Sequence, residues 1–316
     1  MHDRYEEIYD AALRHYVHGE TMESIAHAMG VSRSTVSRLL ARAREEGIVR
    51  ISLAGHQGSR SPLALELADE FGVRVHLVKV GDAASPARRF DQVTRRAGTL
   101  VSSLVGDDTG IGIAWGVTVS LVARHLEPRR LGGVRVVQLN GSAHAGDTAI
   151  PYVGSILQTV AEAYGGRVVH FPVPAFFDHL ESKEWMWRER SVRSVLAEID
   201  RLDLAVFGVG SLRGRVPSHV YSAGYIEPAD LAKIVQEGAV GDVCTVLLRE
   251  DGTWEDIELN RRTTGPTPSQ LQAIGRRVCV VADPQRAQAT LGALRAGVAT
   301  DLVCDDSTAK AVLNRL

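Results

Sequence analysis

The hydrophobic and polar positions of the first fifty residues repeat with the period of an α-helix, in three short segments. The first spans residues 4–18, with apolar or aromatic side chains at Tyr5, Ile8, Ala12, Leu13, Tyr16 and Val17. The other two lie within residues 21–40 and are separated by Gly30, which can take the left-handed conformation of a tight turn. Two crossing helices would touch at Ile25, Ala26, Met29, Val31, Val36 and Leu39. This spacing predicts a helix-turn-helix.

The second helix of this motif carries an outward face of hydroxyl and guanidinium groups. Ser32 stands where an N-cap is expected, with its hydroxyl placed to accept from the amide of Ser34 or Thr35. Such groups read base edges or bind phosphates in the major groove of DNA. The predicted DNA-contacting residues are Ser32, Arg33, Ser34, Thr35, Ser37, Arg38 and Arg42. Two alternatives stay open: a helical hairpin with a solvated face, and a helix-turn-helix used only for protein contacts.

Beyond residue 62 the pattern alternates between helix-length segments and short apolar segments. The short segments are predicted as strands at residues 73–80, 109–113, 134–139, 167–171, 204–209, 242–248, 278–282 and 302–304. Long helices between short strands indicate crossover units, so the fold class predicted here is a doubly wound, mainly parallel α/β domain. A polar stretch at residues 54–62 separates the two patterns. We expect a DNA-binding domain at residues 1–54, ending in a wing or exit strand near residues 48–53, and an effector domain at residues 55–316.

Composition and charge narrow the class of protein. Of the 316 residues, 45% are hydrophobic and 23% are charged, no apolar run approaches a membrane span, and the acidic N-terminus is unlike a signal peptide. We therefore expect a cytoplasmic protein. The net charge of −2 gives no global attraction to nucleic acid, but residues 31–50 hold five arginines against two glutamates. Because one small basic face binds DNA weakly, we expect a homodimer or homotetramer.

Polar loops follow several of the predicted strands. In open α/β sheets, ligands bind where the carboxyl ends of the strands meet, so these loops are candidate binding elements. They are residues 115–118, 140–142, 210–211, 283–286 and 305–308. Each could equally be a turn with a helix cap, and Asp242 could either accept hydrogen bonds from a polyol or pair with an arginine. The sequence has no nucleophile elbow, metal-ligand spacing or phosphate loop, so no catalytic residue, metal or cofactor is expected.

Several motifs occur together in the α/β part: GIAWGVT (112–118), QLNGS (138–142), FPVPA (171–175), GVGS (208–211), GAVGD (238–242), and ALRAG (293–297) followed by LVCDDSTA (302–309). With the helix-turn-helix before them, the chain resembles the SorC-type sugar-binding transcriptional regulators over nearly its whole length. The resemblance implies a domain related in fold to sugar-phosphate isomerases and aminosugar-phosphate deaminases. It also implies a sugar, polyol or sugar-phosphate effector. The implied effector-binding residues are Gly112, Trp115, Gly116, Thr118, Asn140, Gly141, Ser142, Gly208, Gly210, Ser211, Asp242 and Arg286.

The chain departs from the family at one place. Many members carry a sequence similar to Gly-Gly-x-x-Lys before the penultimate helix, whereas residues 283–286 are Asp-Pro-Gln-Arg in this chain. An arginine can hold a phosphate but does not reproduce the compact charge of lysine, so an unphosphorylated effector stays open. The leading hypothesis is a regulator of carbohydrate metabolism that binds double-stranded operator DNA under effector control, without enzymatic activity. The alternative is a sugar-phosphate isomerase-like or deaminase-like enzyme with a DNA-binding appendage.

Overall fold

The computed structural model describes residues 2–49, 61–81, 84–143, 150–213, 218–222 and 224–316. The chain divides into two compact units, Met1–Ser59 and Arg60–Leu316, which are described separately. The strand predicted at residues 48–53 falls mostly outside the described residues.

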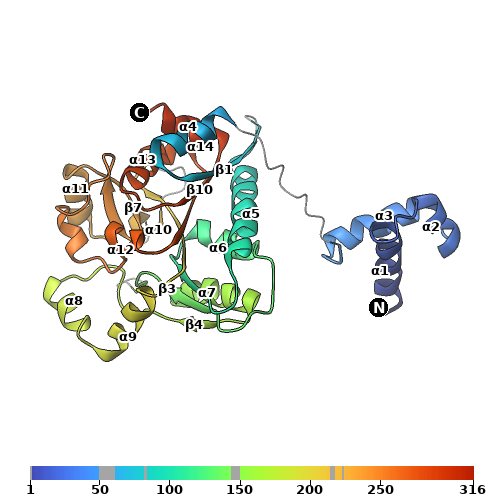
Figure 1. Ribbon diagram of the computed structural model, residues 1–316, viewed down its shortest axis with the longest axis horizontal. Helices are drawn as coiled ribbons and strands as arrows, with labels where there is room; N and C mark the ends of the chain where they lie inside the picture. Colours follow the sequence, from blue (N-terminus) through green and yellow to red (C-terminus); the bar gives the residue numbers. More distant parts are fainter. Residues whose placement is uncertain (1, 50–60, 82–83, 144–149, 214–217, 223) are drawn as a thin grey trace. The chain divides into compact units, whose positions relative to one another are not determined.

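The described part of the N-terminal unit, residues 2–49, forms the helices α1 (His2–Tyr16), α2 (Met22–Met29) and α3 (Arg33–Glu45) (Figure 1). The Thr21 hydroxyl caps α2 by accepting from the Ser24 amide, and Gly30 ends that helix at φ 65°. The Ser32 hydroxyl then accepts from the Thr35 amide at 3.1 Å and begins α3. The predicted helix-turn-helix is present, with its turn and cap formed by the expected residues.

A small apolar core holds these helices together. It consists of Ile8, Ala11, Ala12, Ile25, Ala26, Val36, Leu40 and Ala43. Met29, Val31 and Leu39 pack against it while only partly buried. The expectation that Tyr5, Tyr16 and Val17 belong to the apolar face is wrong, because they lie near the ends of α1 and are exposed.

The second unit is built on a seven-stranded parallel sheet of order β1-β10-β9-β5-β2-β3-β4. Its strands are β1 (Arg74–Val78), β2 (Gly110–Ile113), β3 (Arg135–Gln138), β4 (Arg167–Val169), β5 (Leu204–Gly208), β9 (Arg276–Val281) and β10 (Asp301–Asp305). Helices cover both faces, which confirms the predicted fold class.

Alternation along the strands explains the two layers. In β5, Leu204 and Val206 point to one apolar layer, whereas Ala205 and Phe207 point to the other. The first layer is covered by α5 (Pro86–Leu104), α6 (Val117–Arg124) and α7 (Ile150–Tyr164). The second is covered by α4 (Pro62–Phe71), α9 (Arg190–Ile199), α12 (Pro268–Gln272), α13 (Ala287–Arg295) and α14 (Asp306–Leu313). Cys244, Cys279 and Cys304 are buried free thiols in the second layer.

The prediction of a single strand at residues 242–248 is wrong. Residues 242–248 lie in a hairpin of β7 (Ala239–Val243) and β8 (Val246–Arg249), which pairs with β6 (Gly210–Ser211) in a separate antiparallel sheet. Cys244 and Thr245 turn the chain there with φ of 51° and 70°.

Two helices, α8 (Leu180–Met186) and α9, lie before β5. Residues 284–295 form a 3₁₀ turn, η2 (Pro284–Arg286), followed by α13. The remaining helical elements are α10 (His219–Ser222), α11 (Pro228–Gln236) and η1 (Glu258–Arg261). Across the described ranges, no helix has the length and apolar character needed to cross a membrane.

The strand order creates a switch point between β2 and β5. From β2 the chain moves outward through β3 to β4, and then returns to β5 on the other side of β2. The connections at the carboxyl ends of β2 and β5 therefore leave toward opposite sides of the sheet. Such a point is the usual position of a ligand crevice in an open α/β sheet.

Candidate functional site

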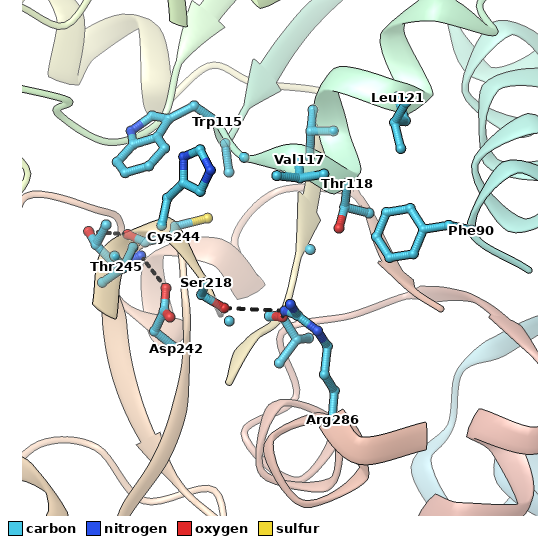
Figure 2. Close-up of a pocket in the computed structure, with 18 of the residues that line it drawn as sticks. Phe90, Trp115, Val117, Thr118, Leu121, Ser218, Asp242, Cys244, Thr245 and Arg286 are labelled. Atoms are coloured by element: carbon cyan, nitrogen blue, oxygen red, sulfur yellow. Dashed lines mark hydrogen bonds between the residues drawn. The ribbon is translucent and has the colours of Figure 1, made fainter. Parts of the chain in front are cut away.

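A cavity of about 520 Å³ opens at this switch point (Figure 2). Loops after β2, β3 and β5, the first turns of α5 and α6, the hairpin β7–β8 and η2 contribute to its wall. Its size is typical of small-molecule sites. The predicted effector-binding residues that line it are Trp115, Gly116, Thr118, Asn140, Gly208, Gly210, Asp242 and Arg286.

The structure places the other four predicted residues outside this cavity. Gly112 lies within β2, where a Cβ atom would be 2.7 Å from the Leu139 side chain. Gly141 packs against backbone carbonyls of residues 173 and 174. Ser142 borders a second cavity of about 220 Å³, and Ser211 is buried with its hydroxyl accepting from the Arg213 amide.

The candidate loop at residues 305–308 serves the fold. Asp305 is fully buried, caps α14 by accepting from the Thr308 amide and binds the buried Arg89 at 2.5 Å. The interpretation as a helix cap is therefore correct for this loop.

Trp115 forms one wall of the main cavity. It follows β2 and donates from its indole Nε1 to the Gly141 carbonyl at 2.8 Å. Tyr225 stacks on the indole with ring centroids 5.1 Å apart. Gly116, at φ 149°, then directs the chain into α6, so that Thr118 in the first turn reaches the cavity. The indole is thus a fixed surface against which a ligand can pack.

Asp242 brings a buried carboxylate to the cavity. It accepts a hydrogen bond from the Tyr221 hydroxyl at 2.8 Å and another from the Thr245 amide at 3.0 Å. Burial raises the pKa of the Asp242 carboxyl above its ordinary value, against the lowering effect of these hydrogen bonds and of Arg286. Gly210 lies directly opposite in β6, where a side chain would overlap the carboxylate.

Arg286 is the buried cation of the cavity. Its guanidinium Nη1 donates to the Val209 carbonyl at 2.5 Å and to the Ser218 hydroxyl at 3.3 Å (Figure 2). Its Nε lies 3.8 Å from the Asp283 carboxylate. Burial lowers the pKa of Arg286, while the nearby carboxylates of Asp283 and Asp242 oppose that shift. The guanidinium is therefore held by protein acceptors.

Several lining residues were missed by sequence reasoning. They are Phe90 from α5, Ser218 and His219 at α10, and Cys244 and Thr245 from the hairpin turn. Phe90 had only the helical periodicity of α5 as a signal, and that is the signal of any amphipathic helix. Asn140 was predicted, and its Oδ1 is buried without a hydrogen-bond partner in the structure described. A buried amide oxygen of this kind is a ready acceptor for a ligand.

The predicted DNA-contacting face lies on α3. Ser32, Arg33, Ser34, Ser37 and Arg38 are exposed, while Thr35 and Arg42 are partly buried. Arg42 pairs with Glu46 at 2.5 Å and Arg33 lies 3.9 Å from Glu23. Arg38 donates to the Thr35 hydroxyl at 3.3 Å. Arg38 therefore contacts a neutral hydroxyl group, whereas Arg33 and Arg42 lie beside carboxylates.

Within the described ranges, no group of three or more histidine, cysteine, aspartate or glutamate side chains is placed to hold a metal ion.

Two family models match the chain. Residues 55–314 match the model described as "Putative sugar-binding domain", and residues 11–70 match "Winged helix-turn helix". A helix-turn-helix unit joined to a sugar-binding α/β domain defines the class of sugar-binding transcriptional regulators. Within that class, the chain belongs to the SorC-type family.

Similar proteins agree with this assignment. A domain of a possible sugar-binding transcriptional regulator from Arthrobacter aurescens TC1 is 41% identical, covering 82% of this chain and 100% of that one, with a TM-score of 0.76. The deoxyribonucleoside regulator of Bacillus subtilis is 27% identical over 97% of both chains. The full-length sorbitol operon regulator SorC from Klebsiella pneumoniae shares the fold, with 21% identity, 98% coverage of both chains and a TM-score of 0.82. These relatives are regulators, and the enzyme alternative gains no support from them.

Proposed function

We propose that the chain binds operator DNA through α3 and that a sugar-like or polyol-like effector in the switch-point cavity controls this binding. The observation that carries the proposal is the presence, in one chain, of an exposed hydroxyl and arginine face on a capped helix and of a cavity at the sheet's switch point. The relatives' names, which refer to deoxyribonucleosides and sorbitol, are consistent with such an effector. We place the protein in the cytoplasm, where its operator would lie.

The cavity favours binding over catalysis. Proton transfer needs a base within reach of the substrate and with a suitable pKa. The Asp242 carboxylate is engaged by the Tyr221 hydroxyl and the Thr245 amide, which suits an acceptor fixed in place. We therefore propose a regulator without enzymatic activity.

A dimer or tetramer is part of the same proposal. Two recognition helices in one assembly contact half-sites about one helical turn of DNA, or a multiple of it, apart. An effector that binds one arrangement of the subunits better than another shifts the population and so changes operator affinity.

The test is the affinity for operator DNA, selected by the full chain from a random-sequence pool. Arg38→Ala should weaken binding about tenfold and reduce the slope of log K against log salt by about one, because one phosphate or base contact is lost. Arg193→Ala, which removes an exposed arginine from α9, is the matched control and should leave affinity unchanged. Equal affinity in the Arg38 variant and the unaltered chain would show that α3 does not read DNA as proposed.

A further inference from the structure

Resting on the proposed function, we propose that the cavity selects an uncharged, hydroxyl-bearing ligand with an apolar face and discriminates against its phosphorylated form. The apolar wall, the engagement of Arg286 and the buried acceptors each support this ligand class.

The wall of the cavity is mainly apolar. Its large apolar side chains include Phe90, Trp115, Val117, Leu121, Val209 and Val220. Figure 2 shows Phe90, Val117 and Leu121 around the first turns of α5 and α6, with Trp115 beyond them. Removing such surface from water favours a ligand that presents a ring or a hydrocarbon face. A small, fully hydrated anion gains little from it.

The charges of the cavity do not favour a phosphate. Among its described residues, the buried carboxylate of Asp242 stands against the single guanidinium of Arg286, while the half-exposed Asp91 carboxylate pairs with Arg95 at 3.4 Å. A phosphate monoester brings a further charge of about −1.5 to −2 at pH 7. To bind it, Arg286 would have to share or leave the Val209 carbonyl and the Ser218 hydroxyl, its present acceptors. Burying an anion without a surplus of positive charge is unfavourable.

Besides the Arg286 guanidinium, the N-terminus of α6 is a feature of the cavity that favours an anion. Unpaired amides and the helix dipole attract negative charge at such a position. The attraction of a single helix terminus is small beside the cost of burying an uncompensated charge next to Asp242. The side chains that α6 offers there, Val117 and Thr118, suit a neutral carbon and hydroxyl surface.

Two buried acceptors can take hydrogen bonds from donors on the ligand. The Oδ1 atom of Asn140 has no partner in the described part of the chain, and the Asp242 carboxylate, which already accepts from Tyr221 and Thr245, is a second buried acceptor in the wall. A sugar or polyol hydroxyl can donate to each of them. A phosphate group at this position would bring acceptors to acceptors, with like charges at Asp242. The pattern is therefore complementary to hydroxyl groups.

The direct test is isothermal titration calorimetry of the full chain with matched pairs of compounds. The pairs are thymidine with thymidine 5′-monophosphate, and sorbitol with sorbitol 6-phosphate, as nucleoside-type and polyol-type probes. We expect at least one neutral compound to bind, and its phosphorylated partner to bind about tenfold or more weakly. Tighter binding by the phosphorylated member, or binding by neither neutral compound, would overturn the proposal.

A pair of variants tests the part played by Asp242. Asp242→Asn should weaken binding of the neutral ligand about tenfold, because a neutral amide is a poorer acceptor than a carboxylate. It should also reduce the difference in affinity between the neutral compound and its phosphorylated partner. Asp107→Asn is the control, since that carboxylate accepts from the Gly132 amide outside the cavity. If a folded Asp242 variant kept the same difference in affinity between the two compounds, the proposed discrimination against the phosphorylated ligand would be contradicted. If that variant does not fold, the matched pairs on the unaltered chain still decide.

The ligand class and the proposed function fail differently. If a neutral compound binds in the cavity without changing operator affinity, effector control is contradicted but the proposed ligand class is not. If a phosphorylated compound binds more tightly than its neutral partner and changes operator affinity, the proposed ligand class is contradicted but the regulatory function is not.

Discussion

At the scale of single residues, glycines with the same appearance in the sequence serve different purposes. Gly116 and Gly210 border the cavity, and Gly210 leaves the space that the Asp242 carboxylate occupies. Gly141 instead lets its own loop approach the backbone carbonyls of residues 173 and 174. Close approach of a ligand and close approach of another chain segment require the same residue type. The sequence could not distinguish the two cases, since the segments involved are far apart along the chain.

Gly141→Ala should therefore destabilise the second unit. A Cβ atom at this position would overlap the carbonyl oxygens of Val173 and Pro174, and strain of this kind costs about 1–3 kcal/mol. The free energy of unfolding, from chemical denaturation, measures the effect. Gly154→Ala is the matched control: it lies in α7 with open space around it and should stabilise that helix by about 0.5–1 kcal/mol. Equal stability of the two variants would show that the loop at Gly141 is not packed as described.

The residue scale also shows how much of the site the sequence reveals. Trp115, Thr118, Asn140 and Arg286 follow strands of the parallel sheet, so the rule on carboxyl ends places them together. Phe90 and Ser218 reach the same cavity through tertiary packing of α5 and α10, for which no local pattern exists.

At the scale of elements, one buried carboxylate connects three neighbouring strands. Asp301 begins β10 and binds Arg74 and His76 of β1 and Arg276 of β9, at 2.9–3.0 Å. Burial alone would raise the pKa of Asp301, but hydrogen bonds from His76, Arg74 and Thr300 and the charge of Arg276 hold it well below its usual range. The native state thus favours the ionised form.

Asp301→Asn should destabilise the second unit by about 3 kcal/mol at pH 7, because it leaves cationic groups around a neutral amide. Since the native pKa is depressed, the contribution of Asp301 is present above the unfolded value of about 3.9 and is lost as pH falls below it. The difference in stability between the variant and the unaltered chain should therefore decrease as the pH is lowered. Thermal unfolding from pH 7 to pH 3 measures it.

The control for this variant is Asp256→Asn, which breaks an exposed ion pair with Arg249. An exposed pair of this kind contributes little to stability, so this change should be nearly neutral. A gap for Asp301→Asn that is independent of pH would contradict the role given to the ionised carboxylate.

The helices and strands differ in how clearly the sequence predicts them. Gly30 and Ser32 specify the turn and cap of the helix-turn-helix by their own chemistry, so that motif was predictable. The hairpin of β7 and β8 was not, because Cys244 and Thr245 form its turn although neither favours positive φ. Hairpin turns of this kind usually carry Asn-Gly or Asp-Gly. Without that signal, residues 242–248 have the pattern of one buried strand.

At the scale of the whole molecule, the chain combines two binding units whose effects must be reciprocal. If the ligand changes operator affinity by some factor, the operator must change ligand affinity by the same factor. This requirement links the face of α3 to the cavity at the switch point without assuming how the units are arranged. It also separates a regulator from a protein with two independent sites.

The most direct measurement is the affinity of the full chain for its selected operator, with and without a saturating neutral ligand identified by calorimetry. We predict a change in operator affinity of about 5- to 150-fold, and the same factor when ligand affinity is measured with and without operator. Arg38→Ala should keep its ligand affinity in the absence of DNA. A ligand that fills the cavity and leaves operator affinity unchanged would contradict control of DNA binding by the effector.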